Sequence, residues 1–493
     1  MGAGNAVNVL FRWNWLLPLT ILLANSGTPC APASAAAGER LVSATGQNPQ
    51  HQVPQSGKGD LTIAVAVDLV TIDVSVTGNP KGDLQAGDFL VYDDGVVQRL
   101  THFSRDQLPL SVALVVDLSG SIQPYLGDLK NKARSALDTL KPEDRVTLFG
   151  FATFASQLTE LTRDASRISD LLGGLRSGGS TNICDAIFIA ARHLRNNARG
   201  QRKAIILISD NCHNITWGQT WGSARQELLE SGATLWGIQI RGTGFCAQEL
   251  AHAREIAEDT GGGMFEAGGL LDGFTGRSLT RLLAQTVANL RTQYTLGFTP
   301  SNAKPDGSFH RLRVALRDGA PCPKCRLAAR TGYYAGTPPS SPPVALNRPA
   351  DSRVQRVDAD VYNRITLAAA DLTEWQEIPF ECRYANEEES PGWQQLRIQL
   401  QIDVSRIEFQ TVDGRHAARF YLGVFFGWPN GPYSTAHWRI VDLQLKEEAY
   451  VKMMSDGVPV SFPVPSAARG AVFKVVICDA QNKQVGSRRF VIQ

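Results

Sequence analysis

The sequence predicts a doubly wound α/β domain that is flanked by short β-strands and followed by an antiparallel β domain. Between about residues 108 and 292, buried apolar runs alternate with amphipathic segments, which is the pattern of a parallel sheet covered by helices on both faces. Shorter strand patterns lie directly before and after this stretch. Beyond residue 355, apolar residues recur at every second position, as in antiparallel strands. These observations indicate an α/β core combined with β domains.

Length and charge limit the classes of function. The chain has 493 residues, which is enough for two or three domains. Charged residues make up 19% of the chain and the formal net charge is +2, values typical of an ordinary globular protein. A nucleic-acid-binding protein would carry a marked basic excess, so the composition argues against nucleic acid as a partner.

The N-terminus has the pattern of a secretory signal peptide. Arg12 precedes the apolar run Trp15–Ala24, and small residues follow, including Ala33–Ala35. We expect residues 1–37 to be removed and the protein to be exported to the periplasm, the cell surface or the medium; an uncleaved anchor is the alternative. No later stretch is apolar enough for a membrane helix. Residues 38–60 are polar and predict a disordered leader.

Seven segments follow from the patterns along the chain. Besides the signal peptide and the leader, we expect strands of a small β unit over 61–107, the α/β domain over 108–292, strands that complete the β unit over 293–335, a proline-rich linker over 336–354 and a β-sandwich of immunoglobulin-like type over 355–493. Phe89–Gln98 predicts a hairpin with Asp94-Gly95 at its tip. A helix is expected over Ile122–Leu140, and a short one over Asp360–Ala370.

Export would make the cysteines candidates for disulfide bonds. Cys322 and Cys325 could close on each other or form half of a zinc site, although no second such pair exists. Cys212 and Cys246 each follow a predicted strand and could bridge neighbouring loops. Cys30 would leave with the signal peptide. Cys382 and Cys478 could link the C-terminal region, which leaves Cys184 without a partner.

Oxygen-bearing side chains gather where buried strands are predicted to end. The apolar run Ala113–Val116 leads into Asp117, Ser119 and Ser121, which a short loop can turn towards one point. In a parallel sheet this carboxyl end borders the binding crevice. A carboxylate and small hydroxyls suit a hard cation such as Mg²⁺, which takes six oxygen ligands near octahedral geometry.

Two later segments add oxygen donors. The glycine-rich loop Gly178–Asn182 contains Thr181, and the buried strand Lys203–Ser209 is followed by Asp210. If the two strands are neighbours in a parallel sheet, the donors of all three segments converge.

In these five residues the sequence resembles a von Willebrand factor type A (VWA) domain, which has a Rossmann-like, doubly wound fold. Asp117, Ser119 and Ser121 match the Asp-x-Ser-x-Ser of its metal-ion-dependent adhesion site, Thr181 its threonine and Asp210 its later aspartate. The sequence departs from the family at Asn211, where many members have glycine. Over about residues 60–335 the arrangement of strands resembles the VWA-related proteins of acidobacteria.

The resemblance implies a binding module. Ser119, Ser121 and Thr181 would be direct ligands of a divalent cation, most simply Mg²⁺, with Mn²⁺ or Ca²⁺ as alternatives, and Asp117 and Asp210 would act through water and by orienting the hydroxyls. An Asp or Glu carboxylate of a protein partner would complete the coordination, so binding would depend on metal. The alternative is a scaffold in a cell-envelope assembly that binds through its β domains.

The sequence argues against an enzyme. A metal-dependent hydrolase would need a general base near the metal, and His213 is the nearest candidate in these segments. A single loop histidine is more typical of a solvated side chain. The chain has no Gly-x-Ser-x-Gly, no His-Glu-x-x-His and no phosphate-binding loop with lysine.

Overall fold

The computed structural model describes residues 69–493, apart from gaps at 79–81, 106–107, 128–129, 131–139, 241–245, 268–275, 292, 302–305, 323, 337–343, 346–355, 391–392 and 466–468. The predicted signal peptide and leader lie outside the described residues, as does most of the predicted linker. None of the helices in the described part of the chain has the length and apolar character that a membrane span requires.

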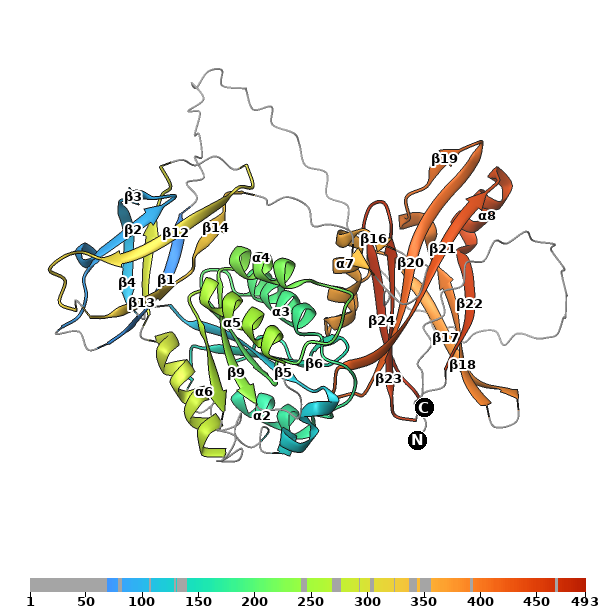
Figure 1. The fold of residues 1–493 in the computed structure, drawn as a ribbon. Helices are drawn as coiled ribbons and strands as arrows, with labels where there is room; N and C mark the ends of the chain where they lie inside the picture. Colours follow the sequence, from blue (N-terminus) through green and yellow to red (C-terminus); the bar gives the residue numbers. More distant parts are fainter. Residues whose placement is uncertain are drawn as a thin grey trace, which may run out of the picture. The chain divides into compact units, whose positions relative to one another are not determined.

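The α/β domain is built on a six-stranded sheet with the order β10-β9-β8-β5-β6-β7 (Figure 1). Its strands are β5 (Leu110–Asp117), β6 (Arg145–Phe151), β7 (Ala155–Gln157), β8 (Arg202–Ser209), β9 (Ala233–Ile240) and β10 (Gly263–Ala267). All neighbours are parallel except β6 and β7. From β5 the chain continues to β6 on one side, whereas β8 and β9 lie on the other. The strand order therefore reverses at β5, where such sheets form their binding crevice.

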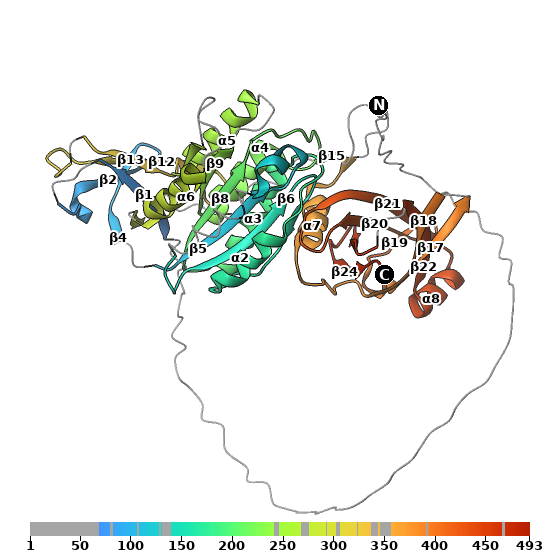
Figure 2. The ribbon, with the colours of Figure 1, turned by 90° about the horizontal axis from the view of Figure 1, so that it is seen from below.

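Helices cover both faces of this sheet (Figures 1 and 2). Strand β5 is buried throughout; its Leu114 and Val116 pack in the core cluster with α2 and α6, and its Ala113 and Val115 in the cluster with α3, α4 and α5. The helices are α2 (Ala165–Gly174), α3 (Ile183–Asn197), α4 (Trp221–Ser231), α5 (Ala247–Asp259) and α6 (Gly276–Arg291). This arrangement confirms the predicted doubly wound fold.

The helix predicted over Ile122–Leu140 begins differently. The chain forms a 3-10 helix, η2 (Gly120–Tyr125), with Pro124 inside it, and residues 131–139 are outside the described part. Proline has no N–H to donate to an α-helical ladder, which is consistent with the tighter turn. Helix α2 and the short strands β7 and β10 were not predicted.

Strands from both sides of the α/β domain pair with one another. The two antiparallel sheets have the orders β13-β1-β11-β4 and β14-β12-β2-β3. Their elements are β1 (Val70–Thr77), η1 (Ala86–Asp88), β2 (Phe89–Asp93), β3 (Val96–Gln98), β4 (Leu100–Arg105), β11 (Tyr294–Phe298), β12 (Phe309–Leu316), β13 (Arg326–Ala329) and β14 (Gly332–Tyr334). Ile72, Val91 and Leu296 are among the residues of their shared core. The predicted hairpin turns at Asp94 and Gly95, both with positive φ.

The C-terminal region contains two antiparallel sheets, β17-β18-β22 and β19-β20-β23-β24, with β21 paired to β20. Residues from both, including Ile398, Phe420 and Val475, form one core, as the predicted sandwich requires. The elements are β15 (Val344–Ala345), β16 (Arg356–Val357), α7 (Ala359–Ala370), β17 (Phe380–Ser390), β18 (Trp393–Ile402), η3 (Val404–Arg406), β19 (Gln410–Val412), β20 (Arg415–Gly427), β21 (Tyr433–Leu445), α8 (Glu447–Asp456), β22 (Val458–Pro465), β23 (Val472–Asp479) and β24 (Val485–Val491).

Two of the three disulfide hypotheses agree with the structure. Cys212 is bonded to Cys246, and Cys322 to Cys325. The proposed link between Cys382 and Cys478 is wrong, because both are free. Cys382 packs against the core between the two sheets, whereas Cys478 belongs to the cluster on the other face of its sheet, beside α7. Successive residues of a strand point to opposite faces, and the sheet therefore separates the two sulfurs.

Alkylation of the unfolded, unreduced protein without its predicted signal peptide should label Cys184, Cys382 and Cys478 and leave the four bonded cysteines unlabelled. Peptide mapping by mass spectrometry measures this directly, with a fully reduced sample as the control. Labelled Cys212 or Cys246 would contradict the pairing.

Burial lowers the pKa of His193 on α3 to about 4, from an ordinary value near 6.5. The folded state thus favours the neutral ring, and this contribution to stability is lost as the pH falls from 6.5 towards 4. As the pH falls over this range, the free energy of unfolding of the wild type should decrease by roughly 1–2 kcal/mol more than that of His193→Gln. Urea unfolding at several pH values measures the difference. The exposed His102, changed to glutamine, is the matched control; equal pH profiles for the wild type and His193→Gln would refute the prediction.

Candidate metal centre

Asp117 is the last residue of β5 and is fully buried. Its Oδ2 accepts a hydrogen bond from the Ser209 hydroxyl at 2.6 Å, and its Oδ1 accepts one from the Ser119 amide at 2.8 Å. Burial raises the pKa of Asp117 to about 7, although the hydrogen bonds from Ser119 and Ser209 act in the opposite direction. A divalent cation beside this carboxyl group would favour its ionised form.

The two serines of the same loop lie side by side. Ser119 precedes η2 and Ser121 lies in its first turn, and their hydroxyl oxygens are 3.1 Å apart. Two adjacent ligands of an octahedral Mg²⁺ with bonds of about 2.1 Å are about 3 Å apart. The spacing of the hydroxyls therefore suits two ligands of one small cation.

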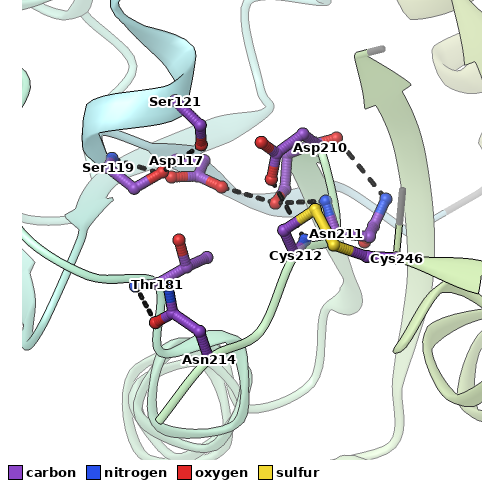
Figure 3. The surroundings of a disulfide bond; sticks show 10 residues. Asp117, Ser119, Ser121, Thr181, Asp210, Asn211, Cys212, Asn214 and Cys246 are labelled. Atoms are coloured by element: carbon purple, nitrogen blue, oxygen red, sulfur yellow. Dashed lines mark hydrogen bonds between the residues drawn. A yellow bond between two sulfur atoms is a disulfide. The ribbon is translucent and has the colours of Figure 1, made fainter. Parts of the chain in front are cut away.

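The Thr181 loop is hydrogen-bonded to the Asp117 loop. The Gly178 amide donates to the Leu118 carbonyl at 2.7 Å, and the Gly120 amide donates to the Gly179 carbonyl at 3.2 Å. Gly179 has φ +94°, and a Cβ there would lie 2.8 Å from the Thr153 hydroxyl, so this close approach requires glycine. Thr181 is 2% exposed. Figure 3 shows its hydroxyl turned towards the Asp117 loop.

Asp210 follows β8, which is the parallel neighbour of β5. Its Oδ1 accepts the Cys212 amide at 3.0 Å, while its buried Oδ2 has no hydrogen-bond partner among the described residues. An unsatisfied buried carboxylate oxygen is costly, by about 1–3 kcal/mol or more, and a cation or its water would satisfy it. Asn211 has φ +57°, a left-handed conformation that asparagine adopts more readily than most residues other than glycine. Asparagine can therefore form the turn after Asp210 at the position where many VWA domains have glycine.

The structure thus brings the five predicted residues together at the carboxyl ends of β5 and β8 (Figure 3). All their donors are oxygen atoms, which is the chemistry that Mg²⁺, Mn²⁺ or Ca²⁺ requires. Ser119, Ser121 and Thr181 would hold the ion, and Asp117 and Asp210 would orient them and supply negative charge. The residues fit such an ion, and their role as ligands stays a prediction.

Comparison with known proteins agrees with this geometry. A family model described as von Willebrand factor type A domain matches residues 112–213, which include all five residues. The chain contains a VWA domain. No curated protein matches the sequence.

Solved structures with similar folds are distant in sequence. An aerotolerance-related membrane protein from Bacteroides fragilis is 20% identical, with 37% of this chain and 98% of that chain covered and a TM-score of 0.29. Proximal thread matrix protein 1 from the mussel byssus, described with a zinc-occupied MIDAS motif, is 17% identical, with 40% and 49% covered and a TM-score of 0.31. A von Willebrand factor type A protein from Catenulispora acidiphila is 14% identical, with 60% and 79% covered and a TM-score of 0.31. None of them supports the resemblance to acidobacterial proteins, which stays a prediction.

His213 in the VWA domain is not the solvated side chain that sequence analysis expected. It is partly buried, its Nδ1 accepts the Ile183 amide at 3.2 Å, and its ring lies against Trp221. Burial lowers the pKa of His213. Since the lone pair of Nδ1 is used to hold the start of α3, the histidine has a structural role in the Thr181 segment.

A carboxylate–histidine group outside the VWA domain was not predicted from the sequence. Asp93, Asp94 and His310 lie in the β unit, with potential ligand atoms within 4.8 Å of one another. His310 Nδ1 is 3.3 Å from Asp93 Oδ1 and 3.1 Å from Asp94 Oδ2, and the Tyr333 hydroxyl donates to Asp93 Oδ2 at 3.0 Å. Asp93 and His310 are 217 positions apart and belong to no motif. These contacts satisfy the buried groups without a metal ion.

Proposed function

We propose that this protein is an exported binding protein whose VWA domain captures a protein partner through a divalent cation. Asp117, Ser119, Ser121, Thr181 and Asp210 hold the cation, and an Asp or Glu side chain of the partner completes its coordination. The observation that supports this most strongly is the convergence of five oxygen donors from three separate segments. One buried carboxylate oxygen there, Oδ2 of Asp210, has no hydrogen-bond partner in the described part of the chain.

The composition of the donor set explains why the partner should offer a carboxylate. Three of the five donors are neutral hydroxyls, and the two carboxylates are partly engaged with Ser209 and with backbone amides. A dication in such surroundings keeps unbalanced positive charge. A carboxylate of the partner neutralises this charge through a strong, directional interaction. Mg²⁺ is the cation we expect, and Mn²⁺ and Ca²⁺ are the alternatives.

Export is part of the proposal. The N-terminal pattern of a signal peptide and the two disulfide bonds fit an oxidising compartment. The periplasm, the cell surface and the medium all meet this condition. We also propose that the site binds without catalysis, because His213, the nearest candidate base in sequence, uses its Nδ1 lone pair to accept the Ile183 amide.

A second candidate function is that of a scaffold which binds through its β domains. Strand β3 lies at the edge of its sheet and exposes Val96 and Val97, which are 58% and 55% exposed. An edge strand with exposed apolar side chains is suited to pairing with a strand of another protein. Binding of this kind would not depend on a metal ion.

Changing Ser119 to alanine should weaken the binding of Mn²⁺ or Mg²⁺ by roughly tenfold or more, because it removes one of three hydroxyl ligands, and tenfold corresponds to about 1.4 kcal/mol. Isothermal titration calorimetry measures the affinity. Capture of proteins from the native cell envelope, with Mg²⁺ or with EDTA, then reports whether the metal site binds a partner.

Ser455→Ala is the matched control, since this exposed serine of α8 donates its hydrogen bonds to the nearby Lys452 carbonyl and Asp456 carboxylate. It should bind the metal and the partner as the wild type does. Partner capture that survives both EDTA and Ser119→Ala would contradict metal-dependent binding and favour the scaffold. Circular dichroism shows whether each variant is folded.

A further inference from the structure

The two segments that supply Thr181 and Asp210 are held together by hydrogen bonds. The Thr181 amide donates to Asn214 Oδ1 at 2.9 Å, and the Asn214 amide donates to the Thr181 carbonyl at 3.1 Å. Four positions after Thr181, in the first turn of α3, Asp185 Oδ1 accepts the Gln219 amide at 2.8 Å. Asp185 therefore fastens the beginning of α3 to the far end of the segment that begins with Asp210.

The second oxygen of this carboxylate is bonded to a residue of the C-terminal region. The Tyr362 hydroxyl of α7 donates to Asp185 Oδ2 at 2.8 Å, and the amide group of Gln219 donates to Asn363 Oδ1. Tyr362 is completely buried, and Gln219 and Asn363 are nearly so. Gly218 has φ +87°, and a Cβ there would lie 2.7 Å from the Tyr362 hydroxyl, so glycine is needed for α7 to approach this closely.

A third loop behind Thr181 also contacts the C-terminal region. The Ser180 amide donates to the Thr153 hydroxyl at 3.1 Å, and the Asn182 amide donates to the Ala152 carbonyl at 2.8 Å. The next residue, Phe154, donates its amide to the Tyr433 carbonyl at 3.2 Å and packs in the cluster that contains α7. The backbone around Thr181 is thus supported from two sides by elements anchored to α7 and its sheet.

We propose that Tyr362 is a positioning residue for the metal site: through Asp185 it fixes the Thr181 and Asp210 segments, so that docking of α7 sets the affinity of the VWA domain for its divalent cation. This inference rests on the proposed function. Without the tyrosine hydroxyl, one oxygen of a buried carboxylate loses its partner, and the start of α3 must move or admit water. A metal site tolerates displacements of only about 0.5 Å in its ligands, so such a shift weakens binding.

The test compares full-length variants for binding of Mn²⁺ alone by isothermal titration calorimetry. Tyr362→Phe removes only the hydroxyl and should weaken Mn²⁺ binding by roughly five- to tenfold, with the protein still folded by circular dichroism. Tyr433→Phe is the matched control, because it removes a buried hydroxyl from the same apolar cluster without touching Asp185. Its Mn²⁺ affinity should equal that of the wild type.

A double-mutant cycle separates positioning from a general loss of stability. If Tyr362 acts through Asp185, Tyr362→Phe should have little further effect on Mn²⁺ affinity in an Asp185→Asn background. Hydrogen exchange should also rise in the amides of residues 180–186 in Tyr362→Phe and not in Tyr433→Phe. If Tyr362→Phe does not fold, Asn363→Ala takes its place in the test. This variant removes the hydrogen bond between Gln219 and α7 and should show the same loss of Mn²⁺ affinity.

The outcomes distinguish the two proposals. Wild-type protein that does not bind Mn²⁺ contradicts the proposed function itself. If the wild type binds Mn²⁺, two results overturn only the positioning role of Tyr362. One is an unchanged Mn²⁺ affinity in Tyr362→Phe, and the other is an equal loss of affinity in Tyr433→Phe.

Discussion

The structure depends above all on the parallel pairing of β5 with β8. This pairing puts Val116 beside Ile208, so the chain leaves both strands at the same edge of the sheet, and the Ser209 hydroxyl can bond to the buried carboxylate of Asp117. A shift of one residue in this register would turn the side chains of β8 to the opposite face. It would remove both the Ser209–Asp117 bond and the approach of Asp210.

The rest of the candidate centre is assembled from backbone hydrogen bonds rather than from side chains alone. The Asp117 and Thr181 loops exchange bonds through Leu118, Gly120, Gly178 and Gly179. Cys212, whose amide holds one oxygen of Asp210, is bonded to Cys246 at the start of α5. Fixed loops lower the entropic cost of gathering five donors around one ion. The second layer of contacts, through Asp185 and Tyr362, extends this preorganisation to the C-terminal region.

The sequence was sufficient for the features that depend on local pattern. The buried run of β5, the spacing of Asp117, Ser119 and Ser121, and the alternation of strands and helices predicted the fold class, which the structure confirms. The boundaries of the domains and the export signal stay predictions. Where the prediction failed locally, at the start of the helix after Asp117, Pro124 favours a 3-10 turn.

Features that depend on contacts between distant residues could not be predicted. Asp185 and Tyr362 are 177 positions apart, and nothing in either neighbourhood indicates that one bonds to the other. His213 was predicted to be solvated, because the local sequence does not show the contacts with α3 and Trp221 that bury it. A disulfide between Cys382 and Cys478 was predicted because both lie in the C-terminal region. In the structure they belong to core clusters on opposite faces of the sheet that contains Cys478.

In the proposed metal site, one divalent cation lies among the hydroxyls of Ser119, Ser121 and Thr181. Anomalous diffraction from crystals of the full chain grown with Mn²⁺ would locate this cation. We expect an anomalous peak within about 2.3 Å of these three oxygen atoms. Well-ordered loops with no peak there, or a peak confined to the group of Asp93, Asp94 and His310, would contradict it.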